Sequence, residues 1–139
     1  MASMPTDPRA VVERLNELIN EHQTTGGGEL FAPDARLVTA QGRVIDLAGL
    51  AAMLATSIEA FPDLRMDVTR WVVEGDTVVT EEVMQRTHKG RFAGLPPTNQ
   101  AVRLPMAHVT RVVDGRIVER IAYHDTAGIL RQLSSPARA

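Results

Sequence analysis

The sequence contains no cysteine, and this absence removes several kinds of chemistry at once. Without thiols the chain has no disulfide framework, no thiolate metal site and no cysteine nucleophile. Aromatic residues are scarce as well, with three Phe, one Trp and one Tyr among 139 residues. No apolar run approaches the roughly 20 residues of a membrane-spanning helix, and residues 1–5 lack the charged and apolar regions of a secretory signal. We therefore expect a soluble cytoplasmic protein without a membrane partner.

A strongly basic surface is also missing. The chain carries 15 Lys and Arg against 17 Asp and Glu, a net charge of -2 at pH 7, and this balance argues against a nucleic-acid partner. The length predicts a single domain, residues 1–139, with an ordered core over about residues 8–133. Histidine is relatively frequent, and three of the four histidines, His88, His108 and His124, fall in the C-terminal half.

The first part of the chain has the pattern of helices. Asp7 is a good N-cap and Pro8 suits the first helical position, and the apolar residues that follow recur at helical spacing until the glycines at 26–28. A second helix is predicted over residues 47–60, capped by Asp46 and ended before Pro62.

From residue 64 the apolar period changes from helical to two, which is typical of strands. Strands are predicted at 65–74, 77–88, 102–113 and 116–123, with hairpin turns at 75–76 and 114–115. A short strand at 37–39, a final helix over 126–133 and a disordered tail at 134–139 complete the pattern. We expect an α+β fold in which a curved antiparallel sheet packs against helices on one side.

Alternate residues of a strand share one face of the sheet. In 102–113 the even positions are mostly apolar, whereas Arg103 and Arg111 are odd, so the even face is predicted to point inward with His108 at its centre. The even face of 77–88 contains Glu82, which would then converge with His108 on one concavity. Strand 116–123 is ambiguous because both of its faces carry apolar residues.

Several segments together resemble SnoaL-like polyketide cyclases, and they are residues 30–35, 61–65, 87–92, 94–98, 109–119 and 123–133. The resemblance covers roughly residues 8–133. It implies the nuclear-transport-factor-two-like fold, a cone-shaped, strongly curved antiparallel sheet wrapped around N-terminal helices, with an internal cavity for a hydrophobic small molecule and no cofactor. A homodimer is expected, because exposed sheet faces and strand edges need covering.

The resemblance also implies roles for single positions. The histidine that assists the family's aldol closure matches His108, but the position of its catalytic aspartate falls on Ala122 and that of a neighbouring glutamine on Met106. The Asp-Arg-Asp set of the related limonene-epoxide hydrolases falls on Met84, Glu82 and Ala122, so none of the three is kept. Epoxide hydrolysis by that mechanism is therefore disfavoured.

Three residues are candidates for catalysis, and each has a structural interpretation beside the functional one. His108 is either a core histidine with a buried partner or an acid–base group, because imidazole titrates near neutral pH. An inward Glu82 needs a partner and could act as a base or orient His108. Asp125 could replace the missing aspartate, but it also precedes the last helix, where an N-cap explains it without chemistry.

Substrate contacts are expected from further residues on or near these strands, namely His124, Tyr123, Arg120, Trp71, Met84, Met106 and His88. His124 and Tyr123 alternate, so only one of them points inward, and His88 at a strand end is expected at the pocket mouth or surface. Trp71 and the methionines fit a cavity lining or an ordinary core equally well. No metal is expected, because no HxH or HExxH spacing occurs.

Three functions remain open at this point. The first is a cofactor-free cyclase or isomerase that removes a proton next to a carbonyl of a hydrophobic natural-product intermediate. The second is an epoxide-opening enzyme, which labelled water entering the product would reveal. The third is a non-catalytic binding protein, because the fold does not determine the function and Ala122 leaves the family's aspartate position empty.

Overall fold

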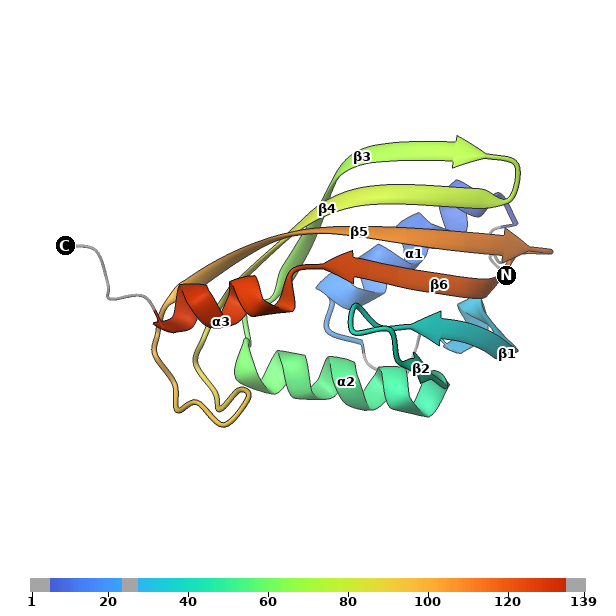
Figure 1. Ribbon diagram of the computed structural model, residues 1–139. Helices are drawn as coiled ribbons and strands as arrows, with labels where there is room; N and C mark the ends of the chain where they lie inside the picture. Colours follow the sequence, from blue (N-terminus) through green and yellow to red (C-terminus); the bar gives the residue numbers. More distant parts are fainter. Residues whose placement is uncertain (1–5, 24–27, 135–139) are drawn as a thin grey trace.

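The computed structural model describes residues 6–23 and 28–134, and its centre is one open sheet of six strands in the order β2-β1-β6-β5-β4-β3 (Figure 1). The strands are β1 (Phe31–Val38), β2 (Val44–Ile45), β3 (Arg65–Glu74), β4 (Thr77–Thr87), β5 (Ala101–Val113) and β6 (Arg116–His124). The helices are α1 (Pro8–Asn20), α2 (Leu47–Ala60) and α3 (Thr126–Ser134), with a short 3-10 turn at Gly28–Leu30. The predicted α+β class is confirmed.

Local sequence signals explain both N-terminal helices. The Asp7 carboxylate accepts the Ala10 N–H at 3.1 Å and begins α1, and the Asp46 carboxylate accepts the Gly49 N–H at 2.8 Å and begins α2. The predicted bounds of α2 are confirmed. Helix α1 ends at Asn20, before the predicted glycine stop, of which positions 26 and 27 lie outside the described residues.

The predicted meander is confirmed in β3–β6, whose neighbouring strands all pair antiparallel. The first strand was predicted too short, because β1 begins at Phe31 and contains Pro33. This proline is tolerated because the pairing of β1 with β6 shifts register between Phe31 and Arg36. The β1–β6 pair is also parallel, so the sheet is mixed at this point. The disordered tail was predicted from residue 134, but Ser134 is the last residue of α3. Residues 135–139 lie outside the described residues.

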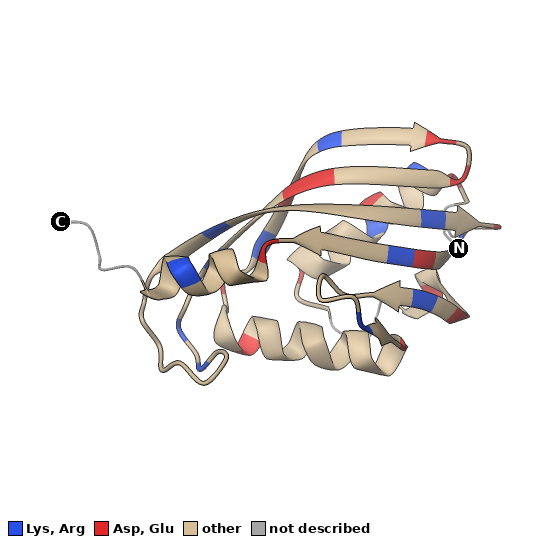
Figure 2. Ribbon diagram, viewed as in Figure 1, with Lys and Arg blue, Asp and Glu red and all other residues tan. Residues whose placement is uncertain are grey.

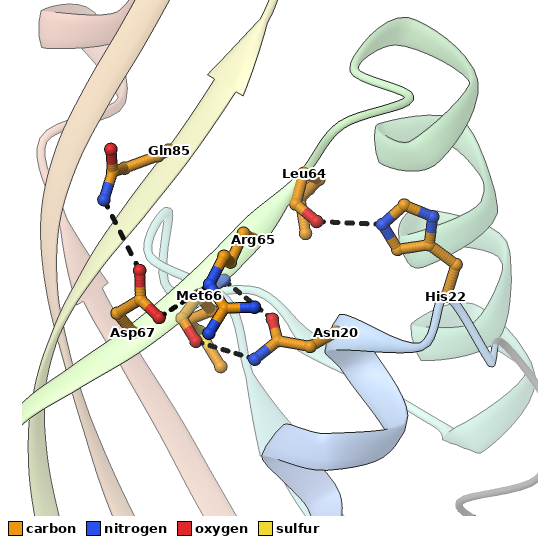
Figure 3. Close-up of polar contacts among 7 residues, drawn as sticks. All are labelled: Asn20, His22, Leu64, Arg65, Met66, Asp67 and Gln85. Atoms are coloured by element: carbon orange, nitrogen blue, oxygen red, sulfur yellow. Dashed lines mark hydrogen bonds and ion pairs between the residues drawn. The ribbon is translucent and has the colours of Figure 1, made fainter.

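Helix α1 is firmly attached to the inner face of the sheet. It buries six residues, Val11, Val12, Leu15, Asn16, Leu18 and Ile19. At its C-terminal end the Asn20 amide donates to the Met66 carbonyl at 2.9 Å and accepts the Met66 N–H at 2.8 Å, and a ring nitrogen of His22 lies 2.8 Å from the Leu64 carbonyl oxygen (Figure 3). These contacts fix α1 against the start of β3.

Helix α2 is held much less tightly. Ala60 is its only buried residue, and Met53 is 44% exposed although the helix is almost entirely apolar. The sequence of α2 contains one charged residue, Glu59, and the ribbon of this helix is correspondingly almost free of charge colouring (Figure 2). The helix lies beside β1 and β2 and thus covers the part of the inner face that α1 leaves open (Figure 1). Across residues 6–23 and 28–134, no helix is long and apolar enough to cross a membrane.

Candidate active site

The inner face of the sheet collects the polar residues that the strand periodicity singled out. On β4 and β5 the even positions are the buried ones, as predicted, and they include Glu82 and His108. Strand β6 was ambiguous because of a bulge. Val112 pairs with Ile117 and Arg111 with Glu119, so Val118 is an extra residue. Before the bulge an odd-numbered residue, Ile117, points inward, and after it an even-numbered one, Arg120, does so. This change explains why apolar residues occur at both odd and even positions.

Glu82 and His108 form a buried pair. The two oxygens of Glu82 are both occupied: Oε2 lies 2.7 Å from His108 Nδ1, and Oε1 accepts the Thr80 hydroxyl at 2.5 Å. The Glu82 side chain is 0% exposed and that of His108 11%. An ionised carboxylate can only accept, so Nδ1 carries the proton and Nε2 of a neutral imidazole is left with a free lone pair. Among the described residues, none hydrogen-bonds Nε2.

A third buried group, Arg120, lies close to this pair. Its Nη1 donates to the Thr110 hydroxyl at 2.8 Å, across the β5–β6 pairing. Its Nη2 is buried and has no hydrogen-bond partner in the part of the chain that the structure describes. The site therefore contains one donor group that the surrounding protein leaves unsatisfied.

The electrostatics of the three groups favour an ionised glutamate and a neutral histidine. Burial by itself raises the pKa of Glu82, but the hydrogen bond and charge of His108, the charge of Arg120 and the Thr80 hydroxyl together keep the pKa below its ordinary value. Burial and the charge of Arg120 lower the pKa of His108, and the hydrogen bond from Nδ1 to Glu82 only partly opposes this. His108 is thus poised as a neutral base.

A small pocket gives access to these groups. It has a volume of about 50 Å³ and lies between α2 and the sheet, lined by His108, Arg120 and Ala122 from the sheet and by Leu37, Leu50 and Met53. Ala122 pairs directly with His108 across β5 and β6. A larger, mainly apolar pocket of about 230 Å³ lies between α1, α2 and the start of β1 and shares Leu50 with the first one. The two pockets are the part of the structure that corresponds to the predicted cavity.

Asp125 lies outside this pocket. Its Oδ1 accepts the Gly128 N–H at 3.1 Å as the N-cap of α3, and its Oδ2 binds Arg131 at 2.5 Å, with 60% of its side chain exposed. The hydrogen bond from Arg131 lowers the pKa of this carboxyl. The structure does not bring Asp125 to His108, and the expectation that it could act as the base finds no support in the geometry.

Histidines 88 and 124 lie toward the other end of the strands. His88 was expected at the mouth, but it is fully buried against Phe61, with Nδ1 accepting the Thr98 N–H at 3.2 Å. That expectation was wrong because residues 88–100 fold back: Asn99 N–H donates to the His88 carbonyl and covers the strand end. His124 is half-buried on the inner face, where burial and the charge of Arg86 lower its pKa.

The remaining predicted contacts are divided between the two faces. Tyr123 is 54% exposed on the outer face and so does not reach the pocket. Trp71 packs against Arg9 in the first turn of α1, and the Arg9 guanidinium lies 4.7 Å from the centroid of the Trp71 ring. Met84 and Met106 are half-buried against the core, and Met106 pairs with both Glu82 and His124.

Sequence reasoning missed the two threonines of the site, Thr80 and Thr110. Both lie on the inward even positions and are fully buried, so the parity that selected Glu82 and His108 also contained the signal for them. It also missed Leu50 of α2, since helical periodicity does not show which strand a helix covers. Within the described ranges, no three His, Asp or Glu side chains lie together as metal ligands would.

Comparison with known proteins places the chain in a family. A sequence profile described as SnoaL-like polyketide cyclase matches residues 9–133. The chain belongs to the SnoaL-like polyketide cyclase family. Nogalonic acid methyl ester cyclase from Streptomyces nogalater is 34% identical to it over 74 residues, which are 53% of this chain and 55% of that protein. The match therefore spans little more than half the length of this curated relative.

Solved structures of other proteins share the fold over nearly the whole chain. IdmH from Streptomyces antibioticus, a proposed polyketide cyclase, is 31% identical with a TM-score of 0.84, and the alignment covers 93% of this chain and 99% of IdmH. AclR from Streptomyces galilaeus, a proposed hydroxylase, is 25% identical with a TM-score of 0.85, covering 99% of this chain and 86% of AclR. The resemblance deduced from separate segments thus extends over nearly the entire chain.

Proposed function

We propose that this SnoaL-like protein is a cofactor-free cyclase or isomerase for a hydrophobic, polyketide-like small molecule. The observation that carries the proposal is the Glu82–His108 pair, because its hydrogen bond leaves Nε2 of His108 as an unprotonated base at an otherwise mostly apolar pocket. Family membership and the similarity to nogalonic acid methyl ester cyclase support cyclisation as the type of reaction.

In this mechanism His108 moves the proton. Nε2 removes a proton from a carbon next to a substrate carbonyl, and the electron pair of that C–H bond forms an enolate. The enolate carbon attacks a second carbonyl carbon of the same molecule, which forms the C–C bond and leaves an alkoxide. The imidazolium then returns its proton to the alkoxide oxygen. Atoms balance within one substrate molecule, and proton transfer by imidazole needs no cofactor.

Glu82 acts as a positioning residue. Both of its oxygens are engaged by His108 and Thr80, so it is poorly placed to take a substrate proton itself. Its hydrogen bond holds the imidazole in the tautomer with Nε2 free, and its charge stabilises the imidazolium that forms, as the carboxylate does in a catalytic triad. Glu82 and His108 together thus take over the work that the family assigns to the aspartate position, which is Ala122 here.

Substrate contacts are proposed on the same inner face. His108, Arg120 and Ala122 line the small pocket, and Leu50 joins it to the apolar pocket under α2, so the reacting carbonyls would lie near the sheet and the apolar part under the helix. Met84, Met106 and His124 lie farther along the same face and would contact the rest of a long substrate. The side chains of Glu82 and His108 are shielded from water, with exposures of 0% and 11%, which strengthens the electrostatic interactions of the reacting groups.

The test is a solvent-exchange assay with the full chain. Nogalonic acid methyl ester, the compound named for the curated relative, is incubated in deuterated water, and both ring closure and deuterium uptake next to a carbonyl are followed by mass spectrometry. We expect a cyclised isomer, or deuterium uptake alone if this ester is accepted but cannot close. Both should be lost in His108→Gln and kept in His22→Gln, which changes a histidine outside the pocket.

Two results would overturn the proposal. The first is the absence of both cyclisation and exchange with this ester and with a panel of open-chain polyketide esters. The second is exchange at the same rate in His108→Gln. Oxygen from labelled water in the product would instead identify an epoxide-opening reaction.

A further inference from the structure

The interior of the protein contains more positive than negative charge. Among the described residues, the buried side chains that are charged at neutral pH are Glu82, Arg86 and Arg120, two guanidinium groups against one carboxylate. His108 adds no charge because its pKa is lowered. Burial lowers the pKa of Arg86 only to about 10, so this group stays charged near neutral pH. Buried charges are costly unless they are paired, so the imbalance requires a physical reason.

Of the two cations, Arg86 stacks on the Phe61 ring, 4.1 Å from its centroid, whereas Arg120 lines the small pocket, where a compensating group can bind. Nη1 is satisfied by Thr110, whereas Nη2 is buried and has no acceptor among the residues that the structure describes. A buried donor without an acceptor destabilises the folded protein, and more so when it is charged. Arg120 also lines the small pocket together with His108 and Ala122. The unsatisfied donor therefore belongs to a residue in the wall of the pocket where a ligand enters.

The other residues of the pocket offer no competing negative charge. Glu82 is covered, with both oxygens engaged by His108 and Thr80. The position opposite His108 is Ala122, whose methyl group leaves room and adds no charge. The other lining residues, including Leu37, Leu50 and Met53, are almost all apolar. An anionic oxygen would thus meet one cation and no exposed carboxylate.

We infer that this pocket binds a ligand with an anionic oxygen, a carboxylate or the ionised enol of a 1,3-dicarbonyl, which accepts a hydrogen bond from Nη2 of Arg120. This inference rests on the proposed function insofar as the same pocket is the reaction site, and it adds the class of substrate. The anionic oxygen held by Arg120 is separate from the carbonyl at which His108 acts: Nε2 removes a proton next to a second carbonyl of the ligand, and the positive charge of Arg120 stabilises the negative charge that develops there.

A binding experiment without any reaction tests the inference. Benzoate and benzamide have nearly the same size and shape, but only benzoate is charged at pH 7. We expect the full chain to bind benzoate about tenfold or more tightly than benzamide in NMR titrations, with the largest shifts at His108 and Ala122. Arg120→Met should remove this preference. Arg111→Met, which changes an exposed arginine on the outer face of β5, should keep it.

A second pair of variants retains Arg120. Ala122→Asp places a carboxylate in the pocket beside the guanidinium, and Ala122→Asn places an uncharged side chain of the same size there. We expect both variants to weaken binding because each side chain fills part of the pocket, and the aspartate variant alone to abolish the preference for benzoate over benzamide. These variants remain informative if Arg120→Met does not fold.

Equal binding of benzoate and benzamide by the wild-type protein would overturn the inference and would leave a buried water as the partner of Nη2. A preference for benzoate that persists in both Arg120→Met and Ala122→Asp would overturn it as well. Because benzoate cannot cyclise, these results are separate from the exchange assay: loss of exchange in His108→Gln supports the proposed function whatever the charge preference of the pocket.

Discussion

Glu82 and Asp125 are both catalytic candidates in the sequence, and the structure gives each of them a basic partner in very different surroundings. Glu82 and His108 lie 2.7 Å apart with side-chain exposures of 0% and 11%. Asp125 and Arg131 lie 2.5 Å apart with exposures of 60% and 68%. The distances are similar, but one pair is buried between two central strands and the other caps a helix in water.

The difference shows that burial, more than contact distance, decides what such a pair can do. Water screens the Asp125–Arg131 pair, so its net contribution is small, and the carboxylate completes the first turn of α3. The Glu82–His108 pair is shielded from water, and each group determines the protonation of the other. Only the second pair holds an imidazole with one nitrogen fixed and the other free.

The largest expected effect is on catalysis through His108. His108→Gln removes the general base but keeps a side chain that can hydrogen-bond Glu82, so we expect kcat to fall about 10²–10⁴-fold with the fold intact. The rate of deuterium exchange next to the substrate carbonyl measures this effect, with circular dichroism to confirm folding. If His108→Gln exchanged deuterium at the wild-type rate, the Glu82–His108 pair would have no catalytic role that the Asp125–Arg131 pair lacks.

Neighbouring glutamates provide the next test, through stability. Glu82→Gln takes away the one buried carboxylate among the described residues, and we expect the free energy of unfolding to fall by about 3 kcal/mol. Glu81→Gln changes the next residue, whose side chain is 51% exposed in an ion pair with Arg70, and we expect a loss below about 1 kcal/mol. Urea denaturation compares the two. Equal losses would contradict a special role for burial.

The pH dependence of stability should also separate the pairs. The pKa of His108 is lowered on folding, so below its ordinary value of 6.5 the unfolded chain binds more protons and stability is lost as the pH falls. The pKa of Asp125 is also lowered, but from 3.8, so its contribution is lost only in stronger acid. We expect His108→Gln to flatten the stability curve between about pH 6.5 and 5, because it removes this titration.

The smallest effect is expected for Asp125. Asp125→Ala removes the acceptor for the Gly128 N–H and should lower the melting temperature slightly through α3, whereas Asp125→Ser restores a capping oxygen and most of this loss. Neither substitution should change kcat. A large fall in kcat for both variants, at unchanged folding, would bring Asp125 back as a catalytic residue.

Much of this arrangement could be predicted because it depends on local signals. The caps at Asp7 and Asp46, the two tight hairpins and the even parity of β4 and β5 are written within a few residues of where they act, and they are enough to place Glu82 and His108 on one face. The separation of Tyr123 from the pocket follows from the same alternation once the inward parity of β6 is known.

The rest depends on contacts between distant segments. The bulge at Val118 arises from pairing with β5, and the burial of His88 arises because residues 88–100 fold back over the strand end. The position of Leu50 over the pocket depends on how α2 crosses β1. None of these features has a local pattern, and the homodimer likewise stays a prediction from the general behaviour of exposed sheets.

The central claim is that Glu82 holds His108 in a single neutral form with Nε2 free. Long-range ¹H–¹⁵N spectra of the imidazole groups test it directly in the full-length protein. We predict that His108 at neutral pH has its proton on Nδ1 and that it titrates below pH 6.5. In Glu82→Gln we expect the Nδ1 proton signal to disappear from the chemical shift that it has in the wild-type protein. A proton on Nε2 at neutral pH, or a pKa of His108 above 6.5, would contradict the account.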